Sequence, residues 1–248
     1  MLDALLLASA MMRALLISLT LAVGIVPAAA SVQTRLLTPT GHTAVVDVYA
    51  PVGPPRALAL IAHGFTRSRA QHVMLAERLS EAGFLVAVPD LQHTLRHQAN
   101  ADAIVALVAA VVAERKLDTL PVVLIGTSAG GLAALLATDR VPRLALWIGL
   151  DPVDAFGQSR SAARGLRVPA VVLRAPSSAC NVSGSARRIA AWLPDRRIER
   201  RIEGASHCDF EDTTDWRCES ICGQADAARQ SLIVAETVKM ACGAVAHP

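Results

Sequence analysis

The sequence of 248 residues predicts an α/β fold, with a mostly parallel, doubly wound sheet that is flanked by helices. The first observation is that short apolar runs alternate along the chain with longer stretches in which apolar residues recur at helical spacing. Continuous apolar runs of this length are typical of strands that are buried on both faces of a parallel sheet. The second observation is that several runs end at a histidine, a glycine-rich turn or an aspartate. Ligands of such sheets bind beyond the carboxyl ends of the strands, so a site is expected there.

The individual elements follow from this alternation. The runs predict strands at 43–49, 57–62, 84–88, 121–125, 144–150, 168–173 and 197–202. The first of these alternates apolar and polar residues, which predicts an exposed edge strand. Helical spacing predicts helices at 71–82, 101–113, 130–138, 185–192 and 225–240.

Residues 1–30 predict a signal peptide rather than part of the fold. An apolar run follows Arg13, and the segment ends in the small residues Ala28, Ala29 and Ala30, which suit a peptidase. The run is short for a membrane span, although an uncleaved N-terminal anchor is the alternative. Residues 31–248 are then long enough for a single domain with its own core. We therefore expect an exported protein, periplasmic or secreted, without a stable membrane span after cleavage, and a monomer.

The composition narrows the classes of partner and cofactor. Aromatic residues make up only 3% of the chain, which disfavours stacking on bases, so no nucleic-acid partner is predicted. The five cysteines all fall in the last third of the chain, at Cys180, Cys208, Cys218, Cys222 and Cys242. In an oxidising compartment disulfides are the default, and an odd number leaves at least one thiol. Zinc at His207, Cys208, Cys218 and Cys222 is one alternative, but the spacing is not a standard one. Calcium is the other, at carboxylates that lack the glycine of a known loop: Asp209, Glu211, Asp212 and Asp215. We predict no metal and no other cofactor.

The nucleophile candidate is Ser128. The segment Gly126-Thr127-Ser128-Ala129-Gly130 matches the G-x-S-x-G pattern and lies between a predicted strand and a predicted helix, which is the context that the pattern requires. A sharp elbow there strains the serine backbone and crowds the positions two before and two after it, where glycine fits. The N–H of Ala129, at the start of the helix, would face a developing oxyanion. The alternative is a glycine-rich turn capped by Ser128.

Three motifs and their order resemble the α/β-hydrolase superfamily, of the esterase or lipase type, over essentially the whole chain after the leader. They are His63-Gly64-Phe65, the serine elbow, and a histidine after the last predicted strand, at His207. The resemblance implies that the backbone N–H of Phe65 is the second oxyanion donor. It also implies that His207 is the base that activates Ser128. The alternatives are a plain strand-ending turn at His63-Gly64 and a surface loop histidine at position 207.

The acid departs from the common pattern of this superfamily. Most members carry it after the next-to-last strand, but residues 174–181 contain no carboxylate. Either the chain is not a working triad enzyme, or the acid lies one strand earlier, at Asp151. The chlorophyllase-like hydrolases resemble the chain there, with a similar Asp-Pro-Val-Asp after the strand. Pro152 is expected to hold the backbone of Asp151 extended. Asp154 is the alternative acid, and a simple Asp-Pro turn is the non-catalytic alternative.

The resemblance also bears on substrate and disulfides. The interval 151–167 is too short for the helical cap domain of many lipases. An open site suits a cutinase-like or chlorophyllase-like esterase, with a small or bulky ester as substrate and an acyl-enzyme intermediate. The alternatives are a thioesterase, peptidase or acyltransferase with the same triad, or a non-catalytic binding protein on this scaffold. Similarity to secreted polyester hydrolases suggests a Cys180–Cys208 disulfide, with Cys218 or Cys222 then bonded to Cys242.

Overall fold

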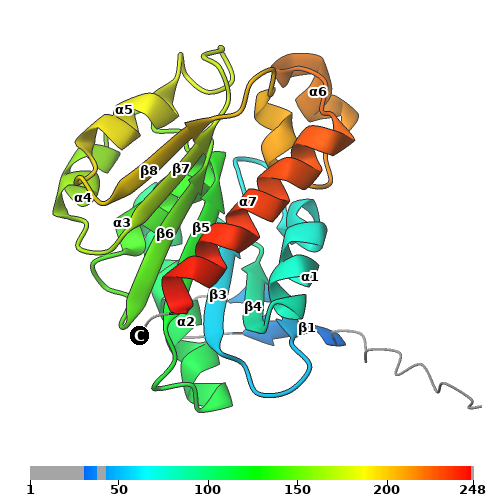
Figure 1. The fold of residues 1–248 in the computed structure, drawn as a ribbon, viewed down its shortest axis with the longest axis vertical. Helices are drawn as coiled ribbons and strands as arrows, with labels where there is room; N and C mark the ends of the chain where they lie inside the picture. The colour runs from blue at the N-terminus through cyan, green and yellow to red at the C-terminus, as the bar shows by residue number, and fades with distance from the viewer. Residues whose placement is uncertain (1–30, 38–42, 247–248) are drawn as a thin grey trace, which may run out of the picture.

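The computed structural model of the protein describes residues 31–37 and 43–246. Its strands form one eight-stranded sheet in the order β1-β2-β4-β3-β5-β6-β7-β8 (Figure 1). The strand bounds are β1 Ser31–Leu37, β2 Ala44–Ala50, β3 Ala57–Ala62, β4 Phe84–Pro89, β5 Val122–Thr127, β6 Leu144–Leu150, β7 Ala170–Arg174 and β8 Arg197–Arg201. β1 pairs antiparallel with β2, and β2 antiparallel with β4. The remaining pairs are parallel, so the predicted mostly parallel sheet is confirmed.

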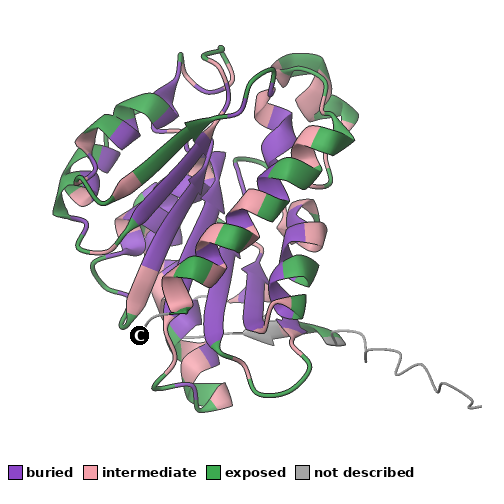
Figure 2. Ribbon diagram, viewed as in Figure 1, coloured by how far each residue is buried: buried purple, intermediate pink, exposed green. Residues whose placement is uncertain are grey.

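Helices cover both faces of the sheet. Their bounds are η2 Arg69–His72, α1 Val73–Glu81, α2 His97–Arg115, α3 Ser128–Ala137, α4 Ser159–Gly165, α5 Ser185–Trp192, η3 His207–Phe210, α6 Trp216–Cys222 and α7 Ala227–Val245, where η2 and η3 are short 3₁₀ helices. One apolar cluster joins the sheet to α2, α3, α4 and α5, and a second joins its other face to α1 and α7. In Figure 2 the central strands and the inward faces of these helices are buried. This two-sided burial explains why the strand sequences are continuously apolar.

The predicted edge strand is wrong. β2 is an inner strand, because β1 pairs with it along its whole length, from Ser31 opposite Ala50 to Leu37 opposite Ala44. β1 was not predicted as a strand, since its residues 32–34 are exposed and carry no apolar alternation. Backbone hydrogen bonds pair such a strand with its neighbour, and they leave no pattern in the side chains. The predicted signal peptide lies outside the described residues. Within the described part of the chain, no helix has the length and apolar character needed to cross a bilayer.

The predicted disulfide pairing is also wrong. The structure contains disulfides between Cys180 and Cys222 and between Cys208 and Cys218, and it leaves Cys242 as a thiol. The reason is α6, which was not predicted. It carries Cys218 and Cys222 one turn apart. Cys218 bonds to η3, and Cys222 bonds to the loop after β7. Cys242 instead packs against the apolar cluster on the α1 and α7 face. The sulfurs of Cys208, Cys218 and Cys222 lie within 4.8 Å of one another, but as disulfide sulfurs they are not thiolate ligands for a metal.

The two disulfides are the main attachment of α6, because no residue of this helix is buried. Replacing a disulfide by serines should destabilise the protein through the entropy of the unfolded chain. We expect Cys180→Ser/Cys222→Ser, which opens a link across 42 residues, to lower the free energy of unfolding by about 4 kcal/mol. Cys208→Ser/Cys218→Ser, with a separation of 10, should cost about 3 kcal/mol. Urea unfolding measures both changes. Cys242→Ser is the control and should unfold like the wild type, whereas wild-type midpoints for both double variants would contradict the prediction.

Candidate active site

The turn from β5 into α3 has the geometry predicted for a nucleophile elbow. Ser128 is the first residue of α3 and has a φ of +53°, in the left-handed region that side chains rarely adopt. A Cβ on Gly126 would lie 2.4 Å from the Gly130 carbonyl oxygen, and a Cβ on Gly130 would lie 2.2 Å from that of His63. Only glycine fits at either position, for the steric reason that the sequence predicts. Thr127 Oγ1 donates to the Phe210 carbonyl at 3.2 Å, which attaches the elbow to η3.

His207 and Asp151 are joined by a hydrogen bond. His207 is the first residue of η3, and Asp151 directly follows β6. His207 Nδ1 lies 2.7 Å from Asp151 Oδ2, and the Asp151 side chain is fully buried. The Asp151 backbone differs from the expected extended form, because its φ is +41° and its N–H donates to the Leu173 carbonyl of β7 at 2.7 Å. The hydrogen bond to β7 therefore decides the backbone here, in place of the local preference that Pro152 imposes.

The loop after β7, where most members of the superfamily carry the acid, supports Asp151 instead. Asn181 is fully buried there, and its Nδ2 donates to Asp151 Oδ2 at 3.3 Å. Its Oδ1 accepts from the backbone N–H groups of Ser178 and Gly184. The N–H of Ala175 donates to the other Asp151 oxygen at 3.2 Å. Sequence reasoning missed Asn181 because it searched 174–181 for a carboxylate only; an asparagine where the acid usually stands was the available signal.

Asp154, the alternative acid, is occupied elsewhere. Both its oxygens accept hydrogen bonds at the start of α4, from the N–H groups of Phe156, Gln158 and Ser159 and from the Ser159 hydroxyl. Burial alone would raise the pKa of Asp154, but these donors outweigh it and hold the pKa below its ordinary value. This carboxylate therefore binds the turn that leads into α4, and Asp151 is the carboxylate that the structure brings to His207.

The loop after β3 lies against Ser128. A Cβ on Gly64 would sit 3.2 Å from Ser128 Cβ, so the backbone passes directly beside the serine. His63 Nε2 accepts the N–H of Leu91 at 2.8 Å, so its proton is on Nδ1, which donates to the Gly64 carbonyl at 2.8 Å. Burial lowers the pKa of His63, which keeps the ring neutral. Because C=O and N–H of a trans peptide point to opposite sides, this bond turns the Phe65 N–H away from the His63 ring.

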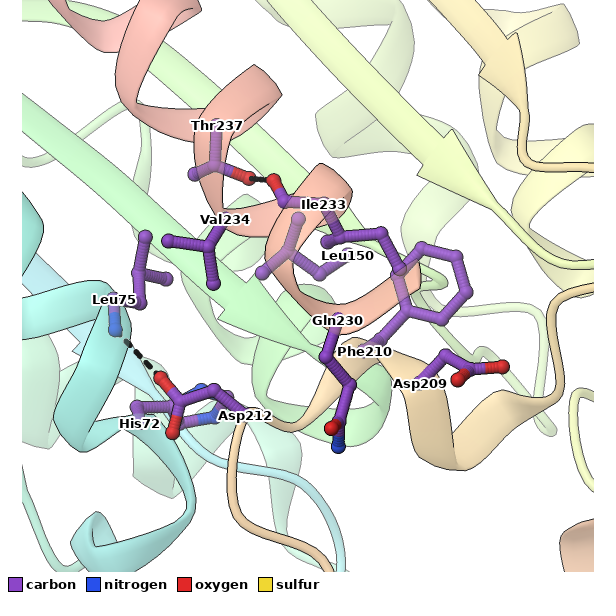
Figure 3. Close-up of a pocket in the computed structure, with 10 residues that line it drawn as sticks. All are labelled: His72, Leu75, Leu150, Asp209, Phe210, Asp212, Gln230, Ile233, Val234 and Thr237. Carbon is purple, nitrogen blue, oxygen red and sulfur yellow. Dashed lines mark hydrogen bonds between the residues drawn. The ribbon is translucent and has the colours of Figure 1, made fainter. Parts of the chain in front are cut away.

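Four of the predicted site residues, all except Asp151, line two hollows that meet at this loop. The larger is a cleft of about 390 Å³, lined by Ser128 and His207, the Gly64–Arg67 loop and residues of α6. The smaller, of about 200 Å³, is lined by the same loop together with Ala129 and His93. A third space, shown in Figure 3, lies behind η3 between α1 and α7 and measures about 10 Å³. It has room for about one water molecule, so it is too small for a substrate.

The comparisons with known proteins agree with this fold. Residues 94–184 match the family described as Esterase PHB depolymerase. A dienelactone hydrolase from Anabaena variabilis is 17% identical, with a TM-score of 0.69, covering 88% of this chain and 98% of its own. The esterase domain of a Rhodothermus marinus protein is 16% identical, with a TM-score of 0.68, and the match covers 87% of this chain and 99% of that domain. The protein TT1662 from Thermus thermophilus is 17% identical, with a TM-score of 0.63, covering 88% and 100%. A search of curated protein sequences found no match.

The sheet order, the elbow and these likenesses define a hydrolase fold. The chain has the α/β-hydrolase fold, as the motifs predict, and the match of residues 94–184 to an esterase family supports the predicted enzyme class, a carboxylic ester hydrolase.

The crossing of α3 over the end of β3 gives a direct test of the elbow. Gly130→Ala would place a Cβ within 2.3 Å of two backbone oxygens, of Ala62 and His63, which cannot move without disturbing the sheet. We expect this variant to lose a large part of its stability, measured as the thermal unfolding midpoint. Gly165→Ala is the matched control, since its Cβ would meet no atom within 4 Å. Equal midpoints for the two variants would mean that the elbow is not closely packed.

Proposed function

We propose that the protein is a serine esterase in which Ser128 is the nucleophile, His207 the general base and Asp151 the acid. The observation that carries this proposal is the 2.7 Å hydrogen bond between His207 Nδ1 and the buried Asp151 carboxylate. His207 and the strained Ser128 line the same cleft, which supports their assignment to one reaction. The backbone N–H groups of Phe65 and Ala129 form the oxyanion site in this proposal.

In the proposed mechanism the same groups act in acylation and in deacylation. His207 Nε2 takes the Ser128 proton while Ser128 Oγ attacks the ester carbonyl, and the two N–H groups stabilise the oxyanion. Asp151 holds the Nδ1 tautomer of His207 and stabilises the imidazolium. The imidazolium then protonates the leaving alcohol, which leaves an acyl group on Ser128. Water, activated by His207, attacks this acyl-enzyme and releases the acid.

Several features support an ester as the substrate. The chain carries only α4 between β6 and β7, so no cap domain is inserted between these strands, and residues of α6 line the 390 Å³ space. An open cleft can take a small ester or one that belongs to a bulky molecule. Thioester, amide and acyl-transfer chemistry use the same triad and are separated from esterase activity by comparing matched substrates. Two disulfides are compatible with export, and we propose one domain over residues 31–248, a cleaved leader at 1–30 and a monomer.

The nucleophile is tested by labelling with a fluorophosphonate, which reacts with an activated serine. We expect the wild type to be labelled at Ser128, and Ser128→Ala to lose labelling and to hydrolyse p-nitrophenyl butyrate about 10⁴-fold more slowly or worse. Ser161→Ala, on the exposed face of α4, is the control and should match the wild type. A folded wild type that is not labelled would indicate a binding protein on a hydrolase scaffold.

The acid is tested by two substitutions that differ in their expected consequence. Asp151→Asn should lower kcat by about 10⁴-fold, because the amide no longer holds the working tautomer of His207. Asp154→Asn should leave kcat close to that of the wild type and lower the free energy of unfolding by about 1–2 kcal/mol, because the amide replaces one of the two oxygens that accept hydrogen bonds in the turn before α4. Ester hydrolysis and urea unfolding of both variants separate these roles. The opposite pattern would assign the acid to Asp154.

A further inference from the structure

Arg67 connects the loop after β3 to the segment that carries His207. It follows Phe65 by two positions, and its own N–H donates to the Gly64 carbonyl at 3.3 Å. Its side chain is 11% exposed. Nε lies 2.9 Å from both oxygens of Glu211, and Nη2 lies 2.6 Å from Oε2. This is a bidentate arginine–carboxylate pair, which fixes orientation as well as distance.

Glu211 is held rigidly on its own side of the pair. It directly follows η3, its N–H donates to the Cys208 carbonyl at 3.2 Å, and its carbonyl accepts from Gln230 of α7 at 2.7 Å. The next residue, Asp212, accepts the N–H of Leu75 at 2.6 Å, as Figure 3 shows at the start of α1. Glu211 is therefore anchored to both α1 and α7, so the Arg67 side chain bonds to a fixed point of the scaffold.

A second route runs from Arg67 through α6. Arg67 Nη1 donates to Asp215 Oδ2 at 3.0 Å, and the other Asp215 oxygen caps α6 by accepting the N–H groups of Arg217 and Cys218. Cys218 is bonded to Cys208, the residue next to His207. The position of the Phe65 peptide is thus linked to the position of His207 both through Glu211 and through α6.

The pair also balances charge beside His207. Burial raises the pKa of Glu211, and the bonds from Arg67 oppose that rise. Burial disfavours the Arg67 cation, but Glu211 and Asp215 outweigh it and raise the pKa of Arg67. Three short contacts from a guanidinium are the geometry of an ionised carboxylate, so we take both groups as charged. The charged groups that line this cleft with His207 are Arg67, Glu211, Asp215 and Arg217, and Asp151 binds the ring from behind.

We propose that Arg67 is a positioning residue, whose buried ion pair with Glu211 fixes the oxyanion loop relative to His207 and offsets the Glu211 charge beside that base. This inference rests on the proposed esterase function. Arg67 itself makes no bond to the reacting atoms in this scheme. Its effect on the reaction passes through the Phe65 peptide and through the electrostatic field at His207.

The charge part of the proposal predicts that the acid limb of the kcat/KM profile shifts in opposite directions when Arg67 or Glu211 is replaced. In Arg67→Gln the Glu211 carboxylate loses its counter-charge and stabilises the His207 imidazolium, so the acid limb of the kcat/KM profile moves to higher pH. In Glu211→Gln the Arg67 cation keeps only the more exposed Asp215 as a counter-charge and disfavours the imidazolium, so the acid limb moves to lower pH. In Arg67→Gln/Glu211→Gln both charges are gone, and the limb returns toward its wild-type position.

The positioning part predicts a separate change in rate. Arg67→Gln and the double variant should lower kcat by up to about 10²-fold with little change in KM, because a displaced oxyanion donor acts only in the transition state. Arg67→Lys keeps the charge but not the fork, so it should lower kcat without moving the acid limb. Arg78→Gln, on the exposed face of α1, is the control for loss of one positive charge and should change neither quantity.

The experiment measures pH–rate profiles of p-nitrophenyl butyrate hydrolysis for these variants, with circular dichroism as the check on folding. The titration midpoint of the His207 ring, followed by NMR in the Ser128→Ala background, gives the same charge test without turnover. Limbs and midpoints that stay fixed, or that move in the same direction for both single variants, would overturn the inference. If Arg67→Gln does not fold, Glu211→Gln and the double variant still decide the charge test. A wild type that resists the fluorophosphonate would instead refute the esterase function, which the NMR titration does not depend on.

Discussion

The site depends on one close approach of backbones, where the start of α3 crosses the end of β3. At Gly130 a Cβ would lie 2.2 Å from the His63 carbonyl oxygen, so the two backbone segments are in contact with no side chain between them. This contact sets Ser128 beside Gly64 and gives the serine its positive φ. The strain of that conformation is compensated by the packing of the surrounding sheet and of α3, whose inward residues are buried in a continuous apolar cluster.

Asp151 and the asparagine that donates to it come from the loops after two neighbouring strands. The carboxylate stands after β6, and a buried asparagine stands after β7 and donates to it. The two loops follow neighbouring parallel strands, so side chains from both can meet at the carboxyl edge of the sheet. In the proposed triad, Asp151 therefore receives a hydrogen bond from Asn181, which stands in the loop after the next strand.

The fold and the central residues of the candidate site could be predicted because burial and close backbone contact restrict which residue types fit at these positions. The apolar runs of β3, β5 and β6 mark strands covered on both faces, and the elbow glycines mark backbones in contact. What could not be predicted depends on partners distant in the chain. β1 is held by backbone pairing, and α6 by disulfides and by Arg67, and neither leaves an apolar pattern. The backbone of Asp151 likewise follows a hydrogen bond to β7, where local sequence favours another conformation.

The way in which α6 is attached has a consequence for when the cleft is complete. Apolar contacts form on folding without any reagent, whereas a disulfide forms only in an oxidising environment. The sheet and its two apolar clusters need no such chemistry, but one wall of the cleft is a helix with no buried residue that is bonded at Cys218 and Cys222. Folding of the scaffold and completion of the wall are thus separate events. The second is governed by the redox potential of the surroundings, so a chain in a reducing medium has its core in place before its cleft.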